Sequence, residues 1–435
     1  MNEINKPTLV IAGCVQSRSG YGAHSRDIAL ELIKSGKYNV SIIPLAWGTT
    51  PLTALANGSD DSNLIISKIN PNALQSQPDI FIHITIPNEF QTAGKYNIGI
   101  TAGIETDLCT PEWIEGCNRM DLVITTSNHS ADVFRKSTFE KRDKETNNVV
   151  GKLELSTKLE VLFEGIEPTI YKILNKTDEV DVDINHSLST VTEDFNFLFV
   201  GQWIQGNLGE DRKDIGMMVK VFLDTFKKKA VNNRPGLIIK TGLAGYSKPE
   251  EFEITKRLNY IRDLCMTDFT GVLPNIYLLH GDLTDSQMNS LYNHKKVKAM
   301  ISFTKGEGFG RPLLEFASIG KPVLAPKWSG LLDFLSEEHH MLIPGELHRV
   351  GRSALNNWII ADAQWHRINY DFASLAMSDI VSNYPKYTEK SRKFVNVCKE
   401  KYSMKAMGEK LVEYIETNTA APEMNTIKLP KLQIL

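Results

Sequence analysis

The sequence predicts an α/β protein made of two Rossmann-like halves that face one another, each built on a parallel sheet. Short apolar runs rich in β-branched residues alternate with amphipathic stretches as far as about residue 345, as in βα units around parallel sheets. An acidic polar stretch interrupts this alternation once, after which it resumes. The length of 435 residues also allows about two to three domains at about 150 residues each.

The first series of strands and helices begins close to the N-terminus. Residues 9–12 are an expected buried strand, and glycines and an amphipathic helix over residues 23–34 follow it. The stretch 139–158 turns polar and charged, so we expect a surface excursion there. The first domain is therefore predicted to cover residues 1–174. Its other strands are expected at residues 40–44, 80–84, 97–101, 122–125 and 159–163.

Residues 175–194 are predicted to link the two domains, because they are acidic and polar and carry no helical apolar stripe. The triplet Asp181-Val182-Asp183 in this stretch matches a metal-binding Asp-x-Asp, but an acidic linker also produces such triplets by chance. The linker interpretation is the one we adopt.

The second domain is predicted over residues 195–385. Helices over residues 386–418 are expected to pack back towards the first domain, and residues 419–435 are expected to form a tail. The strands of the second domain are expected at residues 195–201, 237–240, 276–279, 299–303 and 323–325, and its helices at 215–229, 250–264 and 286–292.

Composition excludes several classes of protein. The 49 Lys and Arg against 52 Asp and Glu leave a net charge of −3, so no global positive field holds a polyanion. No run of 18 apolar residues is present and the first apolar run is too short for a signal segment, so we expect a cytoplasmic chain without a membrane span. The five scattered cysteines fit reduced core thiols. No metal-ligand cluster is visible among the ten histidines and five cysteines, so neither a metal nor another cofactor is expected.

Residues 301–326 are the most informative segment. An expected strand ends at Phe303, and a glycine-rich loop over residues 306–310 leads to Pro312 in the first turn of an expected helix. Glycines let the backbone approach a ligand closely, and the free N–H groups at a helix start form an anion site. This loop therefore predicts a phosphate site.

Two carboxylates flank the predicted phosphate site. Glu307 lies on the loop at the strand end, and Glu315 lies about one turn inside the helix, so both can point to the same opening. An ionised carboxylate only accepts hydrogen bonds, and its two oxygens match a vicinal diol. Sugar hydroxyls are the expected partners of both groups.

The pattern Glu307-Gly308-Phe309-Gly310-x-Pro312-x-x-Glu315, followed by Gly320-x-Pro322-Val323, resembles the Glu-x7-Glu signature of retaining GT-B glycosyltransferases. This superfamily includes glycogen synthase, sucrose synthase and bacterial mannosyltransferases. The resemblance covers about residues 8–416 in architecture. It implies that Glu307 touches the donor sugar and that Glu315 binds the ribose of the nucleotide. It also implies that the amides of Gly308, Phe309 and Gly310 lie against the sugar and the diphosphate.

A second block agrees with this resemblance. The expected strand ending at Gly201 is followed by Gln202, and Arg212 and Lys213 precede the next helix. Two adjacent cations at the carboxyl end of a strand can neutralise a leaving diphosphate. Lys213 matches the lysine of the family, but Gln202 stands where the family has an arginine, so either Arg212 substitutes or the site has one cation fewer. Lys240, at the end of its strand, is a third candidate cation.

The first half supplies further donor and acceptor candidates. Gly20 and Gly22 resemble the glycine-rich loop that closes over the donor phosphates in this family. The block Glu105-Thr106-Asp107 resembles a Glu-Thr-Asp subgroup of the same superfamily. Glu105 follows a strand closely and should face the cleft, where it either orients hydroxyls or caps a loop. The acceptor-side candidates are Glu105, Thr106, Asp107 and His83, although a lone histidine ending a buried strand is more often a core residue.

The resemblance implies a retaining, metal-independent glycosyltransferase, which moves a hexosyl or pentosyl group from a nucleotide-diphosphate sugar to an acceptor hydroxyl. Its catalytic residues would be Glu307, Glu105, Lys213 and Arg212. A nicotinamide-dependent oxidoreductase would need an acidic residue at the end of the second strand, where residues 42–46 offer none. A nucleotide-sugar epimerase of the same fold and a non-catalytic module that binds sugar nucleotides are the two rival interpretations that stay open.

We expect the acceptor to be a saccharide, a lipid or a hydroxymethylated DNA base. The Asn- and Ile-rich chain, with Gln202-Trp203 and its Glu-Thr-Asp block, resembles transferases encoded by tailed phages, some of which glycosylate hydroxymethylated bases in DNA. Basic clusters at residues 134–144, 227–229 and 295–298 are compatible with a local DNA patch, although charge runs are usually solvated faces. A DNA acceptor would predict salt-sensitive binding.

Overall fold

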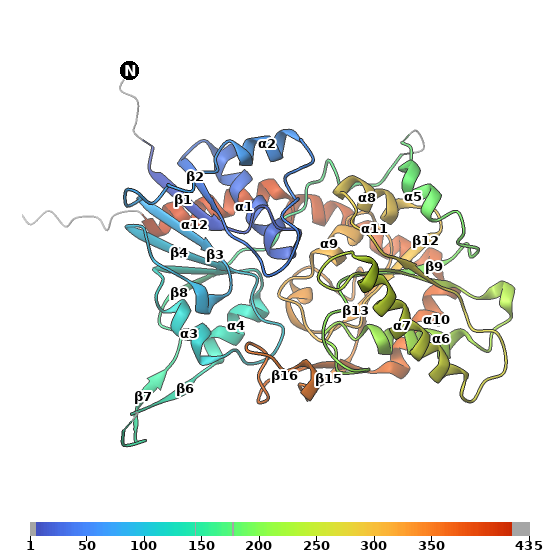
Figure 1. Ribbon diagram of the computed structural model, residues 1–435. Coiled ribbons are helices and arrows are strands. Elements are labelled where there is room, and N and C mark those ends of the chain that lie inside the picture. The colour runs from blue at the N-terminus through green and yellow to red at the C-terminus, as the bar shows by residue number, and fades with distance from the viewer. Residues whose placement is uncertain (1–5, 144, 176–177, 420–435) are drawn as a thin grey trace, which may run out of the picture.

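The chain folds into two α/β halves that lie side by side (Figure 1), as a computed structural model shows for residues 6–143, 145–175 and 178–419. Each half is built on a six-stranded parallel sheet, which confirms the predicted fold class. None of the helices in these residues is both long and apolar enough to cross a membrane. All five cysteines are buried and free.

The first sheet has the strand order β2-β1-β3-β4-β5-β8, and all its pairs are parallel. The order reverses between β1 and β3, so the carboxyl ends of these two strands mark the point where a ligand of such a sheet binds. The strands are β1 (Thr8–Gly13), β2 (Asn39–Pro44), β3 (Ile80–Ile84), β4 (Tyr96–Thr101), β5 (Leu122–Thr125) and β8 (Lys158–Val161).

Four α-helices accompany the first sheet: α1 (Gly20–Ser35), α2 (Asp60–Ile66), α3 (Pro111–Cys117) and α4 (Asn128–Lys136). The predicted surface excursion is an antiparallel hairpin of β6 (Phe139–Arg142) and β7 (Val149–Leu153), which projects from the body of the first half (Figure 1). Its strands are mostly exposed, so the sequence has no alternation of apolar and polar residues there from which the strands could be predicted.

The stretch predicted as a linker contains a short helix, α5 (Val182–Ser187). Asp181 caps this helix by accepting hydrogen bonds from the backbone N–H groups of Asp183 and Ile184, at 3.0 and 3.2 Å. The Asp-x-Asp triplet therefore begins a helix, because the side-chain oxygen satisfies amides that the first turn leaves free.

The second sheet has the order β11-β10-β9-β12-β13-β14 and is also entirely parallel. Its order reverses between β9 and β12. The strands are β9 (Asn196–Val200), β10 (Gly236–Lys240), β11 (Ile276–Leu279), β12 (Val297–Ile301), β13 (Val323–Pro326) and β14 (Met341–Ile343), and the helices between them are α6 (Ile215–Phe226), α7 (Lys248–Met266), α8 (Asp285–Asn293) and α9 (Arg311–Ala317).

An antiparallel hairpin of β15 (Gly345–Arg349) and β16 (Gln364–Ile368) follows the second sheet and reaches the first half. The backbone N–H of Asp107 donates to Gln364 O at 2.9 Å, and the Gln364 N–H donates to Asp107 Oδ1 at 2.6 Å. Trp358 packs against Trp113 of the first half with ring centroids 6.4 Å apart. This hairpin therefore joins the two halves on one side.

Three helices complete the described chain: α10 (Tyr370–Ser382), α11 (Tyr384–Lys401) and α12 (Met404–Thr419). Helix α11 packs against α9 of the second half, whereas α12 crosses back and packs against α1 (Figure 1). The apolar side of α12, from Met404 to Ile415, belongs to the core of the first half. The expected tail lies, from residue 420 onwards, outside the described residues.

Candidate functional site

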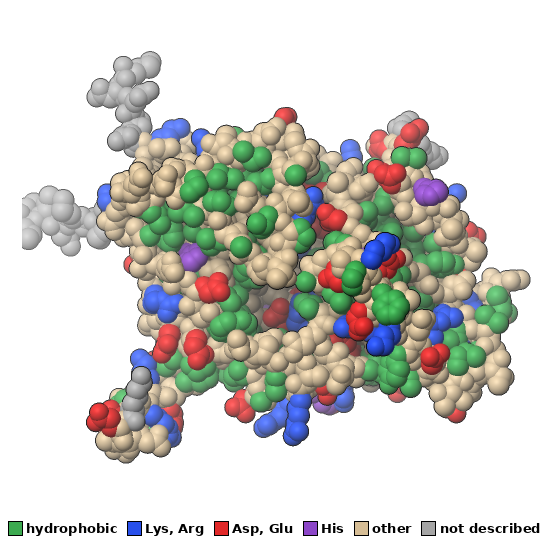
Figure 2. All heavy atoms as spheres, in the orientation of Figure 1, with side chains coloured by type: hydrophobic (Ala, Val, Ile, Leu, Met, Phe, Trp, Pro, Cys, Tyr) green, Lys and Arg blue, Asp and Glu red, His purple; other side chains and the backbone are tan. Residues whose placement is uncertain are grey.

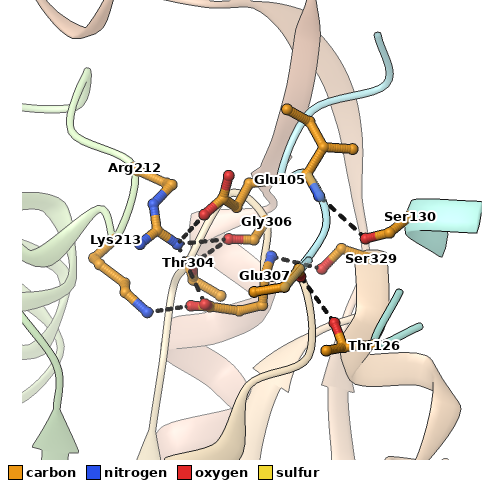
Figure 3. A network of polar contacts seen from close by, with 11 residues as sticks. Glu105, Thr126, Ser130, Arg212, Lys213, Thr304, Gly306, Glu307 and Ser329 are labelled. Atoms are coloured by element: carbon orange, nitrogen blue, oxygen red, sulfur yellow. Dashed lines mark hydrogen bonds and ion pairs between the residues drawn. The ribbon is translucent and has the colours of Figure 1, made fainter. Parts of the chain in front are cut away.

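Four charged side chains meet where the two halves face one another, and we call them the charged cluster (Figure 3). Arg212 and Lys213 lie on the loop between β9 and α6, and Glu307 lies on the loop after β12. Glu105 comes from the other half, on the loop after β4. All three loops start at the carboxyl end of a strand, and the strand order of the second sheet reverses between β9 and β12. The structure thus brings together the four residues predicted to be catalytic.

The Arg212 guanidinium contacts carboxylates of both halves. Its Nη1 lies 3.4 Å from Glu105 Oε1 and 3.2 Å from Glu307 Oε2, and it donates to Gly306 O at 3.1 Å. Lys213 Nζ pairs with the other Glu307 oxygen, Oε1. The exposed fractions of the four charged side chains lie between 12% and 28%, so solvent screens their interactions only in part. Figure 2 shows this region as a hollow between the halves, with acidic and basic side chains inside it.

Burial and neighbouring charges set the ionisation of the charged cluster. Burial alone would raise the pKa of Glu307, but the charges of Lys213 and Arg212 outweigh it and lower this pKa to about 2. Burial lowers the pKa of Lys213 despite its pairing with Glu307. Glu307 is therefore ionised at neutral pH and acts as the shared counter-ion of the two cations.

Two glycines bring the backbones of the halves into direct contact. A Cβ atom on Gly306 would lie 1.9 Å from the carbonyl oxygen of Glu105, and one on Gly308 would lie 1.8 Å from that of Ala102. No side chain fits at either position. The sequence predicted that these glycines let the backbone approach a ligand, whereas in the structure they let it approach the first half.

The same loop carries free amides. Among the described residues, no hydrogen bond is donated by the backbone N–H groups of Gly308, Phe309 or Gly310. Gly310 adopts φ 101°, a left-handed conformation that turns the chain into α9, with Pro312 in the first turn. Consecutive free N–H groups before a helix are a typical environment for a phosphate oxygen.

A buried lysine holds the loop between β9 and α6, which carries Arg212, in place. Lys305 is 2% exposed, and its Nζ donates to Asp214 Oδ1 at 2.8 Å and to Asp211 O at 2.6 Å. Its backbone N–H donates to Arg212 O at 2.7 Å. Asp214 also accepts a hydrogen bond from Tyr370 OH at 2.6 Å. Sequence reasoning missed Lys305, because lysines are seldom fully buried and no local pattern marks this one.

A second buried cluster surrounds Glu315 on α9. Glu315 Oε1 accepts from Arg311 Nε and Oε2 accepts from Tyr292 OH, both at 3.0 Å. Arg311 Nη1 also pairs with Asp27 on α1 of the other half. Burial raises the pKa of Glu315 to about 7, although Arg311 opposes this shift. Glu315 is thus held at the boundary between the halves.

Glu164, just after β8, adds a further buried carboxyl next to Arg311, and we expect it to make stability depend on pH. Burial raises its pKa from 4.5 to about 7 in the folded chain, although the Arg311 charge opposes the shift. Between these two values the folded chain keeps a proton that the unfolded chain has lost. Glu164 therefore contributes stability that is fully present below about pH 4.5 and is lost as the pH rises through 7.

The check is urea unfolding of the wild type and of Glu164→Gln between pH 4.5 and 7. Because the variant has no titrating group at this position, the free energy of unfolding of the wild type minus that of the variant should fall across the window. A difference that stays constant with pH would contradict the raised pKa.

Three acceptor-side candidates lie apart from the charged cluster. His83 Nδ1 accepts a hydrogen bond from a backbone amide at 3.1 Å, and burial lowers the pKa of His83 to about 4. Thr106 is fully buried, and its hydroxyl donates to a backbone carbonyl at 2.9 Å. Asp107 holds the β15–β16 hairpin, as described above. Of the four acceptor-side candidates, only Glu105 belongs to the charged cluster.

Three donor-side candidates also have other contacts. Ser19 caps α1 by accepting from Gly22 N–H at 3.0 Å, so Gly20 and Gly22 lie in the first helical turn. A Cβ atom on Gly22 would lie 2.1 Å from a backbone oxygen, whereas the space around Gly20 is open. Lys240 Nζ donates to Tyr246 OH at 2.7 Å, and burial lowers the pKa of Lys240 to about 8. The structure does not bring Lys240 into contact with the charged cluster.

Some of the lysines and arginines in the basic clusters of the sequence have partners within the chain. Arg135 and Lys136 both pair with Asp132, and Arg142 pairs with Glu140 at 2.6 Å. In the other two clusters, Lys227 pairs with an aspartate at 2.7 Å, and the ammonium of Lys296 donates to two backbone carbonyls. These contacts reduce the charge that the clusters offer to a polyanion.

Several solved structures share this architecture. HepE (Alr3699) of Anabaena, in complex with UDP and glucose, matches with TM-score 0.60 and 13% identity over 94% of this chain and 100% of that chain. Sucrose-phosphate synthase of Thermosynechococcus elongatus matches with TM-score 0.61 and 11% identity over 96% and 100%. A glycosyltransferase of Rickettsia africae matches with TM-score 0.58 and 14% identity over 96% and 100%.

The chain has the GT-B fold. No family model matches the sequence, and no curated protein matches it. Within the GT-B fold, the charged cluster lies between the two sheets, where loops from both halves can enclose one ligand.

Proposed function

We propose that this protein is a retaining glycosyltransferase, which transfers a sugar from a nucleotide-diphosphate sugar to an acceptor hydroxyl. The observation that carries the proposal is the charged cluster, in which Arg212 and Lys213 face Glu307 at the reversal of strand order in the second sheet. The free amides of residues 308–310 lie on the same loop as Glu307. Cations, free amides and carboxylates in one place suit a sugar joined to a diphosphate.

In this proposal the cations stabilise the leaving diphosphate. Its charge grows as the bond to the anomeric carbon breaks, and Arg212 and Lys213 are already fixed where that charge develops. The phosphate oxygens compete with Glu307 for these cations, which turns the Glu307 carboxylate towards the sugar. The departing phosphate takes the proton of the acceptor hydroxyl, which attacks from the same face. The residues orient the reactants, stabilise charge and exclude water.

We infer that Arg212 supplies the second cation of the phosphate site, in place of the arginine that the family has at the position of Gln202. Gln202, at the position of the family's arginine, lines a pocket of about 130 Å³ together with Arg212 and Lys213. The Arg212 guanidinium reaches Glu307 at 3.2 Å. These contacts support the substitution of Arg212 for the missing cation, so no metal ion is part of the proposed mechanism.

The test is a panel of nucleotide sugars, beginning with UDP-glucose because the HepE structures contain UDP, glucose or UDP-glucose. A ligand at 100 times its dissociation constant adds about 2.7 kcal/mol to the free energy of unfolding, which a thermal shift detects. The donor that stabilises the chain is then assayed for transfer in EDTA, and the anomer of the product is read by NMR. If no nucleotide sugar stabilises the chain, the proposal fails.

The Glu315→Ala variant should weaken binding of a nucleoside diphosphate by about tenfold or more, because a charged hydrogen bond to the ribose contributes about 1.5–3 kcal/mol. Isothermal titration calorimetry with UDP, at a pH above the Glu315 pKa of about 7 so that the carboxylate is ionised, measures the change. Glu337→Ala, which removes an exposed glutamate paired with Lys327, is the matched control and should bind as the wild type does. Equal affinities of Glu315→Ala and the control would exclude this role for Glu315.

The same assays separate the rival functions. An epimerase would convert its sugar nucleotide without any acceptor, and a binding module would neither hydrolyse nor transfer it. A hydroxymethylated DNA acceptor predicts binding at low salt that weakens steeply as salt is added, and no binding at low salt would remove it. Saccharides and lipids are the other acceptors to assay.

A further inference from the structure

Arg311 forms ion pairs with carboxyl groups from both halves of the molecule. Asp27 lies on α1 of the first half and pairs with Arg311 Nη1. Glu315 lies on α9 of the second half and accepts from Arg311 Nε at 3.0 Å. The side chains of Arg311, Asp27 and Glu315 are 16%, 12% and 9% exposed. One largely buried guanidinium therefore divides its hydrogen bonds across the boundary.

Both oxygens of Glu315 already have a partner within the second half. Arg311 donates to Oε1, and Tyr292 OH donates to Oε2 at 3.0 Å. A carboxylate oxygen can accept more than one hydrogen bond, so each oxygen keeps a lone pair that can accept from a ribose hydroxyl. The orientation of Glu315 and its free lone pairs thus depend on how Arg311 and Tyr292 hold it.

The ion pair with Asp27 determines how many hydrogen bonds Arg311 can donate to Glu315. While Asp27 is ionised, Nη1 points to the first half and only Nε serves Glu315. A buried guanidinium needs a counter-ion, so without the Asp27 charge it would turn to Glu315 and form a bidentate pair. That pair would fill the remaining lone pair of Oε2, which already accepts from Tyr292 OH, so a ribose diol could no longer bond to both oxygens of Glu315.

We propose that Asp27 and Arg311 are positioning residues that keep Glu315 open to the ribose of the nucleotide. This inference rests on the proposed function, because it assumes that Glu315 binds the donor. Asp27 acts through Arg311 and lies in the half of the molecule opposite to Glu315. The affinity for the nucleotide therefore depends on the contact between the halves.

The experiment compares wild type, Asp27→Asn and Asp333→Asn. Asp333 Oδ2 accepts hydrogen bonds from Asn128 N and Nδ2 across the same boundary, at 2.9 and 3.2 Å, and is the matched control. We expect Asp27→Asn to weaken UDP binding by about fivefold or more, as measured by calorimetry. The KM for the donor should rise by the same factor, and kcat should stay nearly unchanged. Asp333→Asn should change neither quantity by more than about twofold.

Two further variants separate positioning from folding. Asp27→Glu keeps the charge and should recover most of the affinity for UDP. In a Glu315→Gln background, Asp27→Asn should have little further effect, because the carboxylate through which it acts is absent. Equal losses in the Asp27 and Asp333 variants, or a full additive loss in the Glu315→Gln background, would overturn the inference. If wild type binds another nucleoside diphosphate in place of UDP, the variants are compared with that ligand. If wild type binds no nucleoside diphosphate, the proposed function fails and this inference fails with it.

Discussion

The Glu307→Gln variant should transfer sugar about 100-fold more slowly than wild type while it binds a nucleoside diphosphate at least as tightly. Glu307 is the shared counter-ion of Arg212 and Lys213, and its pKa of about 2 keeps it ionised in any assay buffer near neutral pH. Glutamine preserves the size of the side chain but not its charge. In the proposed reaction, both cations then lose the carboxylate that competes with a diphosphate, while the sugar loses the negative charge beside its developing positive charge.

Two measurements separate these effects. Calorimetry with UDP gives the affinity, and initial rates at saturating donor give kcat. Glu337→Gln is the control, because its exposed carboxylate pairs with Lys327 away from the charged cluster. A Glu307→Gln protein with the turnover of wild type would show that Glu307 takes no part in the reaction.

Replacing Lys213 with methionine should lower kcat by about 100-fold or more, and should also weaken donor binding. Lys213 pairs with Glu307 Oε1, on the opposite carboxylate oxygen to Arg212, so the two cations approach the same site from two directions. Methionine retains most of the apolar volume of lysine but carries no charge. Because the charge of the diphosphate would grow as it departs in the proposed reaction, the loss should be larger in the transition state than in the bound ground state.

Lys220→Met is the matched control for this prediction. Lys220 lies on α6, the helix that begins just after Lys213, and pairs with Asp224 at 2.6 Å on a partly exposed surface. Its replacement should leave both kcat and KM unchanged, and thermal unfolding verifies that both variants fold. An unchanged kcat in Lys213→Met would remove Lys213 from the mechanism.

Much of the fold could be predicted because buried parallel strands appear as continuous apolar runs. The strands β3 (Ile80–Ile84) and β11 (Ile276–Leu279) coincide with their predicted ranges. The hairpins β6–β7 and β15–β16 were not predicted, because their exposed faces carry mixed polar residues without a regular alternation. The helix α5 in the predicted linker is only 6 residues long, too short for an apolar stripe to show.

The charged cluster could be predicted because its members follow strand ends, which lie at one edge of a parallel sheet. The Arg311–Asp27 pair could not, because its residues lie 284 positions apart and no local pattern tells which helix of one half meets which helix of the other. The contact of Gly306 and Gly308 with residues 102–105 could not be predicted from the sequence for the same reason. A glycine shows that something comes close, but not what it is.

The return of α12 to the first half has a consequence for the order in which the protein is made. The residues from Met404 to Ile415 complete the same core as α1 and the strands of the first sheet. During synthesis, the part of α1 that packs against α12 therefore stays uncovered until about residue 419 has left the ribosome, whereas the second half can bury its own core before that. The half that is translated first is the last to be finished, and a nascent chain arrested before α12 would present that uncovered surface to chaperones.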